Sequence, residues 1–237
     1  MSDILKMHLS IVTVVRNSLP LLNKTVASIR EQKNQSFQYV IIDGASTDST
    51  RDFVLNRPAP ASVVVSEPDG GIYSAMNKAP AICHGEYIQY LNAGDTLVGT
   101  DTVEEVLPHL DGKADVIIFN YRIKGRRYAP SLSFRRLLGG SPCHQAIFYR
   151  RSYLLEHPFN TRFKYCADYH HLLNALSRAV VRTADPVVVD YDITGLSSQR
   201  HARSVIRRER ALSAWKSTIS IHWRIIIALY NLMRYIK

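Results

Sequence analysis

The chain has 237 residues, of which 46% are hydrophobic, enough to bury a full core as one α/β domain with a C-terminal appendage. Its three cysteines, Cys83, Cys143 and Cys166, lack the spacing of a disulfide framework or a zinc site, which favours a reducing cytoplasm. The net charge of +10 is uneven, because residues 200–237 hold nine Lys or Arg against one acid. This tail carries +8, whereas residues 1–199 carry only +2. The first ten residues lack the apolar run of a signal peptide.

Strand-like and helix-like segments alternate over residues 8–92. The apolar runs at 8–15, 37–43, 61–66 and 86–92 are typical of parallel strands that are covered on both faces. Helices are expected at 19–33, 48–57 and 72–82, with Pro20 in the first turn of the first. The alternation indicates right-handed βαβ units, and therefore a mostly parallel, twisted sheet with helices on both faces.

The pattern is looser after residue 100. We expect helices at 101–110 and 166–179, and strands at 115–123, 180–182 and 186–191. Residues 144–155 are expected to form a strand that continues into a helix, 124–128 a solvated hairpin tip, and 193–200 a loop. The domain prediction is an α/β domain over 1–200 and a basic helical tail over 201–237.

Polar side chains follow the first four predicted strands, at the sheet edge where ligands of parallel sheets bind. The four carboxylates among them would converge on one crevice and would require a cation or a donor-rich ligand to offset their repulsion. Mg²⁺ or Mn²⁺ needs only one or two protein carboxylates when substrate phosphates complete its shell. The chain has no G-x-G-x-x-G after its first strand and no Walker lysine motif, which argues against dinucleotide-binding and P-loop folds. The strand-end residues are Arg16, Asn17, Asp43, Glu67, Asp69, Asn92 and Asp95.

Five motifs follow one another in a specific order: LSIVTVVRN, VIIDGASTDST, SEPDGGIYSAMNKA, YLNAGD and HQAIFYRR. Together they resemble the family 2 glycosyltransferases, which have the Rossmann-like GT-A fold. The similarity is greatest to the branch that builds bacterial exopolysaccharide and O-antigen repeat units, and it covers roughly residues 8–200. It implies an enzyme that moves a hexose from a nucleotide sugar, most often UDP-linked, to an acceptor hydroxyl.

The resemblance also implies roles for individual residues. Asp43 corresponds to the aspartate that hydrogen-bonds the nucleobase, Asp95 to the last metal-binding carboxylate, and Asp168 to the catalytic base. His144 and Gln145 correspond to a pair on the acceptor side. The donor-binding set comprises Thr13, Asn17, Asp43, Ser46, Asp69, Tyr73, Asn77, Lys78 and Asn92.

One departure from the family concerns the metal. The commoner pattern has aspartates at the positions of Asn92 and Gly94, so only Asp95 remains of that carboxylate set. Similar N-x-G-D endings occur in the polysaccharide branch. We therefore expect Mn²⁺ or Mg²⁺ to be held by Asp95 together with the donor diphosphate and water.

The same side chains have simpler structural interpretations. Asp43 and Asp168 could cap the helices that follow them, and Asp95 could be an ordinary turn residue. A position in the core is the alternative to a binding role for Tyr73, Met76 and His144.

A cysteine nucleophile and a histidine metal site are the other chemistries that the residue types suggest. Cys143 and His144 are expected to point to opposite faces of a strand, which argues against a cysteine nucleophile. His170 and His171 have no third ligand at metal spacing and are expected on a helix surface.

The tail is helical in pattern from Val205, with apolar residues recurring every three or four positions. Its longest charge-free stretch near the end, Ile225 to Met233, is nine residues, too short to span a bilayer. A cationic amphipathic helix suits the anionic inner leaflet, so we expect a cytoplasmic protein held peripherally at the inner face of the cell membrane. The acceptor would then be a polyprenyl-diphosphate-linked saccharide. The alternative is a helix that packs on the domain or on a second subunit.

Other functions are less compatible with the sequence. A sugar-nucleotide pyrophosphorylase would carry a glycine-rich basic loop where this chain has RNSLPLL. A non-catalytic nucleotide-sugar-binding protein would need Asp43 but neither Asp95 nor Asp168, and a GDP-sugar-dependent transferase would share the mechanism. Nucleic acid is not expected as a partner, because the positive charge lies in an amphipathic tail without an aromatic stacking platform.

Overall fold

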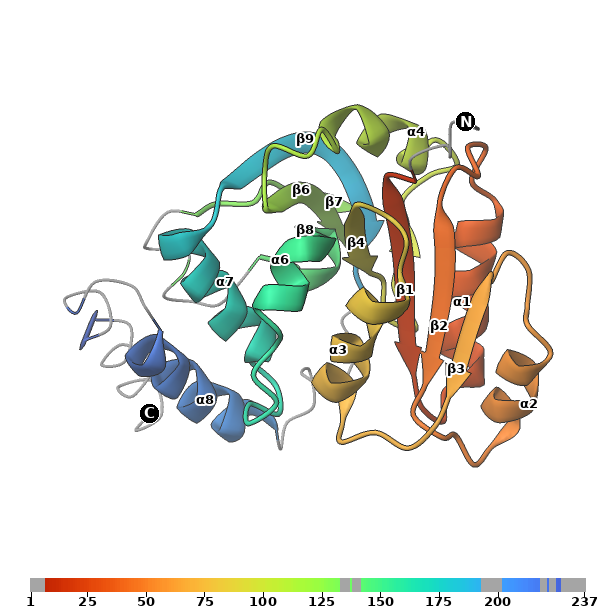
Figure 1. The fold of residues 1–237 in the computed structure, drawn as a ribbon, viewed down its shortest axis with the longest axis horizontal. Helices are drawn as coiled ribbons and strands as arrows, with labels where there is room; N and C mark the ends of the chain where they lie inside the picture. The colour runs from red at the N-terminus through yellow and green to blue at the C-terminus, as the bar shows by residue number, and fades with distance from the viewer. Residues whose placement is uncertain are drawn as a thin grey trace.

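The computed structural model describes residues 7–132, 137, 142–192, 202–217, 221, 225 and 226. One sheet runs through the molecule in the order β3-β2-β1-β4-β8-β6-β9-β5, with β7 paired to β6 (Figure 1). The strands are β1 Leu9–Val15, β2 Gln38–Asp43, β3 Val63–Ser66, β4 Tyr87–Tyr90, β5 Thr96–Leu97, β6 Val116–Ile123, β7 Arg126–Tyr128, β8 Ile147–Arg150 and β9 Val181–Asp190.

The first four strands form the parallel part of the sheet. β1 pairs in parallel with both β2 and β4, and β2 pairs in parallel with β3. β8 then joins antiparallel to β4, and β6 antiparallel to β8, before β9 returns parallel to β6. The carboxyl ends of β1 to β4 therefore meet at one edge, as the βαβ pattern predicts.

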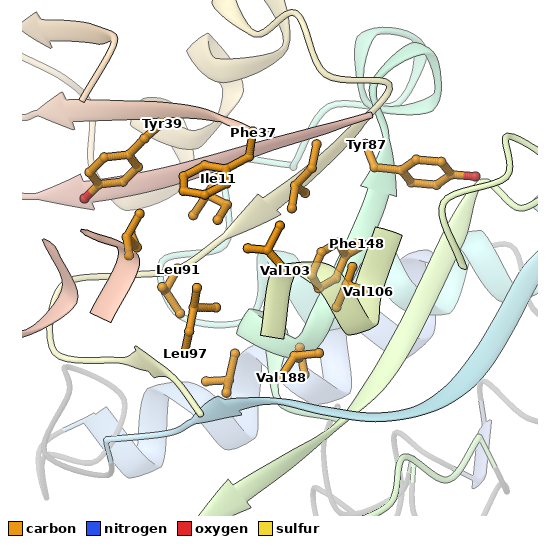
Figure 2. Packing of buried hydrophobic residues seen from close by; sticks show 14 of the residues in the cluster. Ile11, Phe37, Tyr39, Tyr87, Leu91, Leu97, Val103, Val106, Phe148 and Val188 are labelled. Carbon is orange, nitrogen blue, oxygen red and sulfur yellow. The ribbon is translucent and has the colours of Figure 1, made fainter. Parts of the chain in front are cut away.

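Helices cover both faces of this sheet (Figure 1). Successive side chains of β1 pack into different helical layers. Ile11 lies in a cluster with Leu22 of α1, and Val12 lies in a cluster with Met76 of α3. Figure 2 shows the first cluster, to which Val103 and Val106 of α4 also belong. The helices are α1 Leu19–Arg30, α2 Ser49–Leu55, α3 Ile72–Ile82, α4 Thr102–Val106, α6 Arg151–Glu156, α7 Ala167–Arg178 and α8 Ala202–Lys216, with short 3-10 turns η1 Leu107–His109 and η2 His144–Ala146.

The predicted α/β architecture is confirmed, with three local differences. The two strands predicted at 180–182 and 186–191 form one strand, β9 (Val181–Asp190), although its register against β6 shifts on both sides of Asn120. The Asn120 side chain bridges this irregularity by donating to the carbonyl of Asp185, just before Pro186. The prediction of a strand at 144–146 is wrong, because these residues form η2, and β5 was not predicted.

The interpretation of His170 and His171 as surface residues is also wrong, because both are buried. α7 is covered on two sides. His171 Nε2 donates to the carbonyl of His157, and its ring lies against Phe159, while His170 faces the carbonyl of Ser213 on α8. A local pattern does not reveal this second cover, which comes from a distant part of the chain.

α8 packs on α7 through one stripe of buried residues and leaves its other face exposed (Figure 1). The buried stripe includes Ala202, Ile206, Glu209 and Ser213, spaced three or four residues apart. The predicted loop at 193–200 lies outside the described residues, as does most of the tail after Ser217. Within the part of the chain that the structure describes, no helix is long and apolar enough to cross a membrane.

Gly85 provides a test of the β1–β4 junction. A Cβ at this position would lie 2.4 Å from the backbone nitrogen of Ser10 and 2.5 Å from the carbonyl carbon of Leu9. We expect Gly85→Ala to lower the free energy of unfolding by about 1–3 kcal/mol, because the backbone of β1 must move. Urea denaturation measures this. Gly99→Ala is the control, since a Cβ there meets nothing within 4 Å; equal effects of the two substitutions would contradict the prediction.

Candidate active site

Asp95 ends a tight turn that follows β4. Its backbone N–H donates to the carbonyl of Asn92 at 3.0 Å, and Gly94 adopts φ +105°, a conformation that favours glycine. The carboxylate is only 4% exposed and accepts one hydrogen bond on each oxygen, from Gln145 Nε2 and from the backbone N–H of Asp192, both at 2.8 Å. Burial raises the pKa of Asp95 to about 7, although these two donors oppose the shift.

Asp192 is a residue of this site that the sequence analysis missed. It follows β9, and its Oδ2 atom lies 3.6 Å from the point that a Cβ of residue 94 would occupy. A carboxylate from another strand thus lies beside the position where the commoner family pattern has an aspartate. The sequence does carry a signal for it, because Asp192 also follows a predicted strand, the one at 186–191.

The donor atoms at this turn fit a hard cation. Asn92 Oδ1 is buried and has no hydrogen-bond partner among the described residues. It lies in the same turn as the Asp95 carboxylate, with Asp192 adjacent. The described residues contain no cluster of three or more His, Cys, Asp or Glu that could hold a metal ion by itself. The arrangement therefore suits a cation whose shell is completed by phosphate oxygens and water.

A second network joins the ends of β1 and β2. Asp43 is fully buried and accepts hydrogen bonds from the backbone N–H of Ser46, from the Ser46 hydroxyl and, at 2.7 Å, from Ser66 Oγ. Ser46 Oγ accepts from the backbone N–H of Asn17 at 2.8 Å. Asp48, rather than Asp43, caps α2 by accepting from Thr50 N at 2.9 Å. The capping interpretation of Asp43 is therefore wrong.

Asp69 and Lys78 lie next to this network. Asp69 Oδ1 accepts from the backbone N–H of Gly71 at 2.9 Å, and its Oδ2 atom lies 2.6 Å from where a Cβ of Gly44 would be. Lys78 Nζ forms an ion pair with Glu67 at 2.8 Å. The strand-end carboxylates gather at one edge as predicted, but each has local partners that offset its charge.

Two predicted donor-binding residues are engaged inside the protein. Thr13 is fully buried, and its hydroxyl donates to the carbonyl of Leu91 at 2.9 Å and accepts from Tyr39 OH at 3.0 Å. The Asn77 side chain pairs with the backbone of Phe159, where its amide donates to the carbonyl and its oxygen accepts from the N–H, both at 2.9 Å. The structure gives both residues an internal positioning role.

Asp168 lies in the first turn of α7 and is half-buried. Its Oδ1 atom accepts from Tyr73 OH at 2.8 Å, and the same hydroxyl lies 3.0 Å from the carbonyl of Tyr165. Burial, and then the charge of Asp168, raise the pKa of Tyr73 well above its ordinary value. Tyr73 therefore remains protonated and donates, which ties α3 to the start of α7.

His144 and Gln145 are adjacent in η2, and each lies near a different carboxylate of the site. Gln145 bonds to Asp95, whereas His144 is buried between Tyr90 and Phe159, with ring centroids 5.8 and 5.9 Å away. Burial lowers the pKa of His144, although nearby Asp168 opposes this shift, so the ring is neutral. Its Nε2 atom has no hydrogen-bond partner in the described part of the chain.

Cys143 is not suited to act as a nucleophile. Its thiol donates to Gln145 Oε1 at 3.1 Å, and burial raises its pKa far above the ordinary value. A thiolate is the reactive form of cysteine, and this environment disfavours it.

Residues 10–168 match the family described as Glycosyl transferase family 2. The chain belongs to this family. A PGL/p-HBAD biosynthesis glycosyltransferase of Mycobacterium bovis (strain BCG / Pasteur 1173P2) is 31% identical over 216 residues, which cover 84% of this chain and 82% of the relative. An uncharacterized glycosyltransferase of Mycobacterium tuberculosis (strain ATCC 25618 / H37Rv) is 29% identical over 210 residues, covering 83% of this chain and 79% of the relative.

Solved structures show the same fold. S. aureus TarS residues 1–349 in complex with UDP-GlcNAc has a TM-score of 0.72 at 19% identity, covering 97% of this chain and 72% of that one. The mannosyltransferase PcManGT of Pyrobaculum calidifontis, in complex with GDP-Man and Mn²⁺, has a TM-score of 0.70 at 18% identity, covering 96% and 72%. The protein is thus a glycosyltransferase with the GT-A type of α/β fold.

The raised pKa of Asp95 predicts that the free energy of unfolding depends on pH. The folded state keeps a proton on Asp95 up to about pH 7, whereas an unfolded aspartate loses it near its ordinary value of 3.8. The wild type should therefore lose stability relative to Asp95→Asn as the pH rises from about 4 to about 7, by up to about 4 kcal/mol. Urea denaturation in EDTA at several pH values measures this difference. Asp52→Asn, an exposed site, is the control, and a difference that does not vary with pH would contradict the prediction.

Proposed function

We propose that this glycosyltransferase moves a hexose, with inversion, from a UDP-linked donor to a polyprenyl-diphosphate-linked saccharide in the assembly of cell-surface polysaccharide. The observation that carries the proposal is the placement of Asp168. Its carboxylate lies in the first helical turn of α7 and is oriented by Tyr73, and its charge acts on His144, which adjoins Gln145 and through it Asp95. This arrangement combines a base for an acceptor with a carboxylate suited to the donor side.

Asp168 would take the acceptor proton. A sugar hydroxyl is a weak nucleophile until it loses its proton, and a positioned carboxylate accelerates that step by roughly 10²–10⁴. Tyr73 donates to Oδ1 and so orients the carboxylate. Inversion is implied by the resemblance to the family: attack opposite the leaving group inverts the anomeric carbon, so one base is sufficient and no covalent intermediate is needed.

Asp95 would act on the donor side. Asp95, Asn92 Oδ1 and Asp192 would hold Mn²⁺ or Mg²⁺ together with the donor diphosphate. When bound, a divalent cation supplies positive charge against the negative charge that the leaving diphosphate gains. Asp43, Ser46 and Asn17 would bind the nucleoside at the ends of β1 and β2, and Lys78 lies on the adjacent helix to meet the phosphates. His144 and Gln145 would line the acceptor side.

The solved structures support two candidate nucleotides for the donor. The UDP-GlcNAc complex of TarS favours a uridine donor, whereas the GDP-Man complex of PcManGT keeps a GDP-sugar as the second candidate. The relatives named for PGL/p-HBAD biosynthesis support a role in glycoconjugate assembly. A role in the assembly of cell-surface polysaccharide is proposed because the five sequence motifs resemble those of the exopolysaccharide and O-antigen branch.

The exposed face of α8 supports a peripheral position at the inner face of the cell membrane. Leu212 and Trp215 are 40% and 56% exposed, and Arg203, Arg208 and Lys216 are exposed on the same helix. Apolar side chains flanked by cations suit an anionic lipid surface. The same charge would attract an anionic lipid-linked acceptor.

The test of the proposed reaction is Asp168→Asn. We expect its turnover to fall by roughly 10²–10⁴, because the acceptor hydroxyl loses its base. UDP binding should be unchanged. Turnover is measured as UDP release from UDP-glucose, UDP-galactose and UDP-GlcNAc with a polyprenyl-diphosphate-linked sugar, and binding by calorimetry.

The same calorimetry tests the donor. UDP should bind more tightly with Mn²⁺, and this gain should be lost in Asp95→Ala. Binding of GDP in place of UDP would change the donor while keeping the mechanism. Absence of binding for both nucleotides, with and without Mn²⁺, would overturn the donor site, and full turnover by Asp168→Asn would overturn the role of that residue.

Membrane binding is tested with Trp215→Ser. We expect binding to vesicles that contain phosphatidylglycerol to weaken about tenfold, because the indole no longer inserts. Co-sedimentation with the vesicles measures this, and binding should also weaken in high salt. Leu55→Ser is the matched control, because Leu55 is 54% exposed on α2, which lies on the opposite side of the molecule from α8 (Figure 1). Equal binding by both variants would contradict the prediction.

A further inference from the structure

Glu209 is the one acidic residue among positions 200–237, yet it lies on the buried side of α8 and is only 8% exposed. A buried carboxylate is costly unless hydrogen bonds compensate the loss of water. Every other charged residue of this segment is basic, so the placement of a single acid against α7 requires a specific explanation.

The carboxylate accepts three backbone hydrogen bonds from consecutive residues. Oε1 accepts from Lys164 N at 2.7 Å, and Oε2 accepts from Tyr165 N at 2.8 Å and from Cys166 N at 3.0 Å. Successive backbone N–H groups that converge in this way form an anion-binding concavity. Glu209 fills it from a different helix, 43 residues further along the chain from Cys166.

This concavity lies immediately before α7 and ends at its N-cap residue. Cys166 is that residue and makes no side-chain cap bond in the described structure. The Glu209 carboxylate accepts from the N–H groups of the two residues before the helix and of Cys166, and it places negative charge where the helix dipole favours it. α8 therefore holds the segment that leads into α7.

Residues 164–166, which Glu209 holds, end two residues before Asp168. Tyr73 OH lies 3.0 Å from the carbonyl of Tyr165 and 2.8 Å from Asp168 Oδ1. Glu209 of α8 thus holds residues 164–166 through their N–H groups, while Tyr73 of α3 holds Asp168 and lies against the carbonyl of Tyr165. Loss of either contact changes the direction from which the Asp168 carboxylate approaches a bound acceptor.

We propose that Glu209 is a positioning residue that acts on the reaction through Asp168. The inference rests on the proposed function, in which Asp168 is the base. It extends the site beyond residue 168, where the family match ends, to a helix whose sequence carries no recognised motif. Displacements of about 1 Å at a catalytic group can cost about 10²-fold in rate, so the contact of Glu209 with Cys166, two residues before the base, has kinetic consequences.

The experiment combines Glu209→Gln with Asp168→Asn. Gln retains the shape and one acceptor oxygen but loses the charge and the second oxygen. We expect Glu209→Gln to lower kcat for the UDP-hexose panel about tenfold with the donor KM and the UDP dissociation constant unchanged. In the Asp168→Asn background the same substitution should have no further effect, because its action passes through Asp168. Glu105→Gln, at an exposed position on α4, is the matched control.

The outcomes separate this proposal from the proposed function. Unchanged kcat in Glu209→Gln, or an equal loss of kcat in both backgrounds, overturns the positioning role. Full activity of Asp168→Asn overturns the assignment of the base instead. If Glu209→Gln does not fold, amide hydrogen exchange on the wild type tests the contact directly: the N–H groups of residues 164–166 should be protected, and rapid exchange at all three would overturn the proposal.

Discussion

The parallel strands β3, β2, β1 and β4 lie in a sheet that is covered by helices on both faces, so most of their side chains are apolar and the charged groups lie where the strands end. Asp43 follows from this constraint at the end of β2, and Asp95 at the turn after β4. Each is buried and is compensated by backbone and side-chain donors rather than by bulk water. The carboxylates at the edge of the sheet are therefore held in place by hydrogen bonds before any ligand binds.

The other half of the site depends on α7. This helix carries Asp168 and is held from three directions: by the Tyr73 hydroxyl of α3, by the Glu209 carboxylate of α8, and by the apolar contacts of both faces. Gln145 bonds to Asp95 after β4, and the neighbouring His144 lies within reach of the charge of Asp168. In the proposed mechanism, the donor side is thus built by the sheet, and the side of the base by helix packing.

The first hundred residues were predictable because strand and helix patterns there are local and nearly uniform. The later residues were less so: β9 contains Pro186 and an irregular register, and η2 replaces an expected strand at His144. Asp95 and Asp168 could be identified from motifs. Asp192 and Glu209 reach the site through contacts over many residues of chain, 97 in the first case. No periodicity marks such contacts, and the burial of His170 has the same cause.

Asn77 and Glu209 have in common that both bind backbone rather than side chains. Asn77 pairs with the N–H and carbonyl of Phe159, and Glu209 with the N–H groups of residues 164–166. Contacts of this kind do not depend on which side chains the intervening loop carries. The loop before Asp168 can therefore exchange surface residues while its path is preserved. Under the proposed mechanism, this loop is a place where evolution, or protein engineering, would vary acceptor preference without displacing the base.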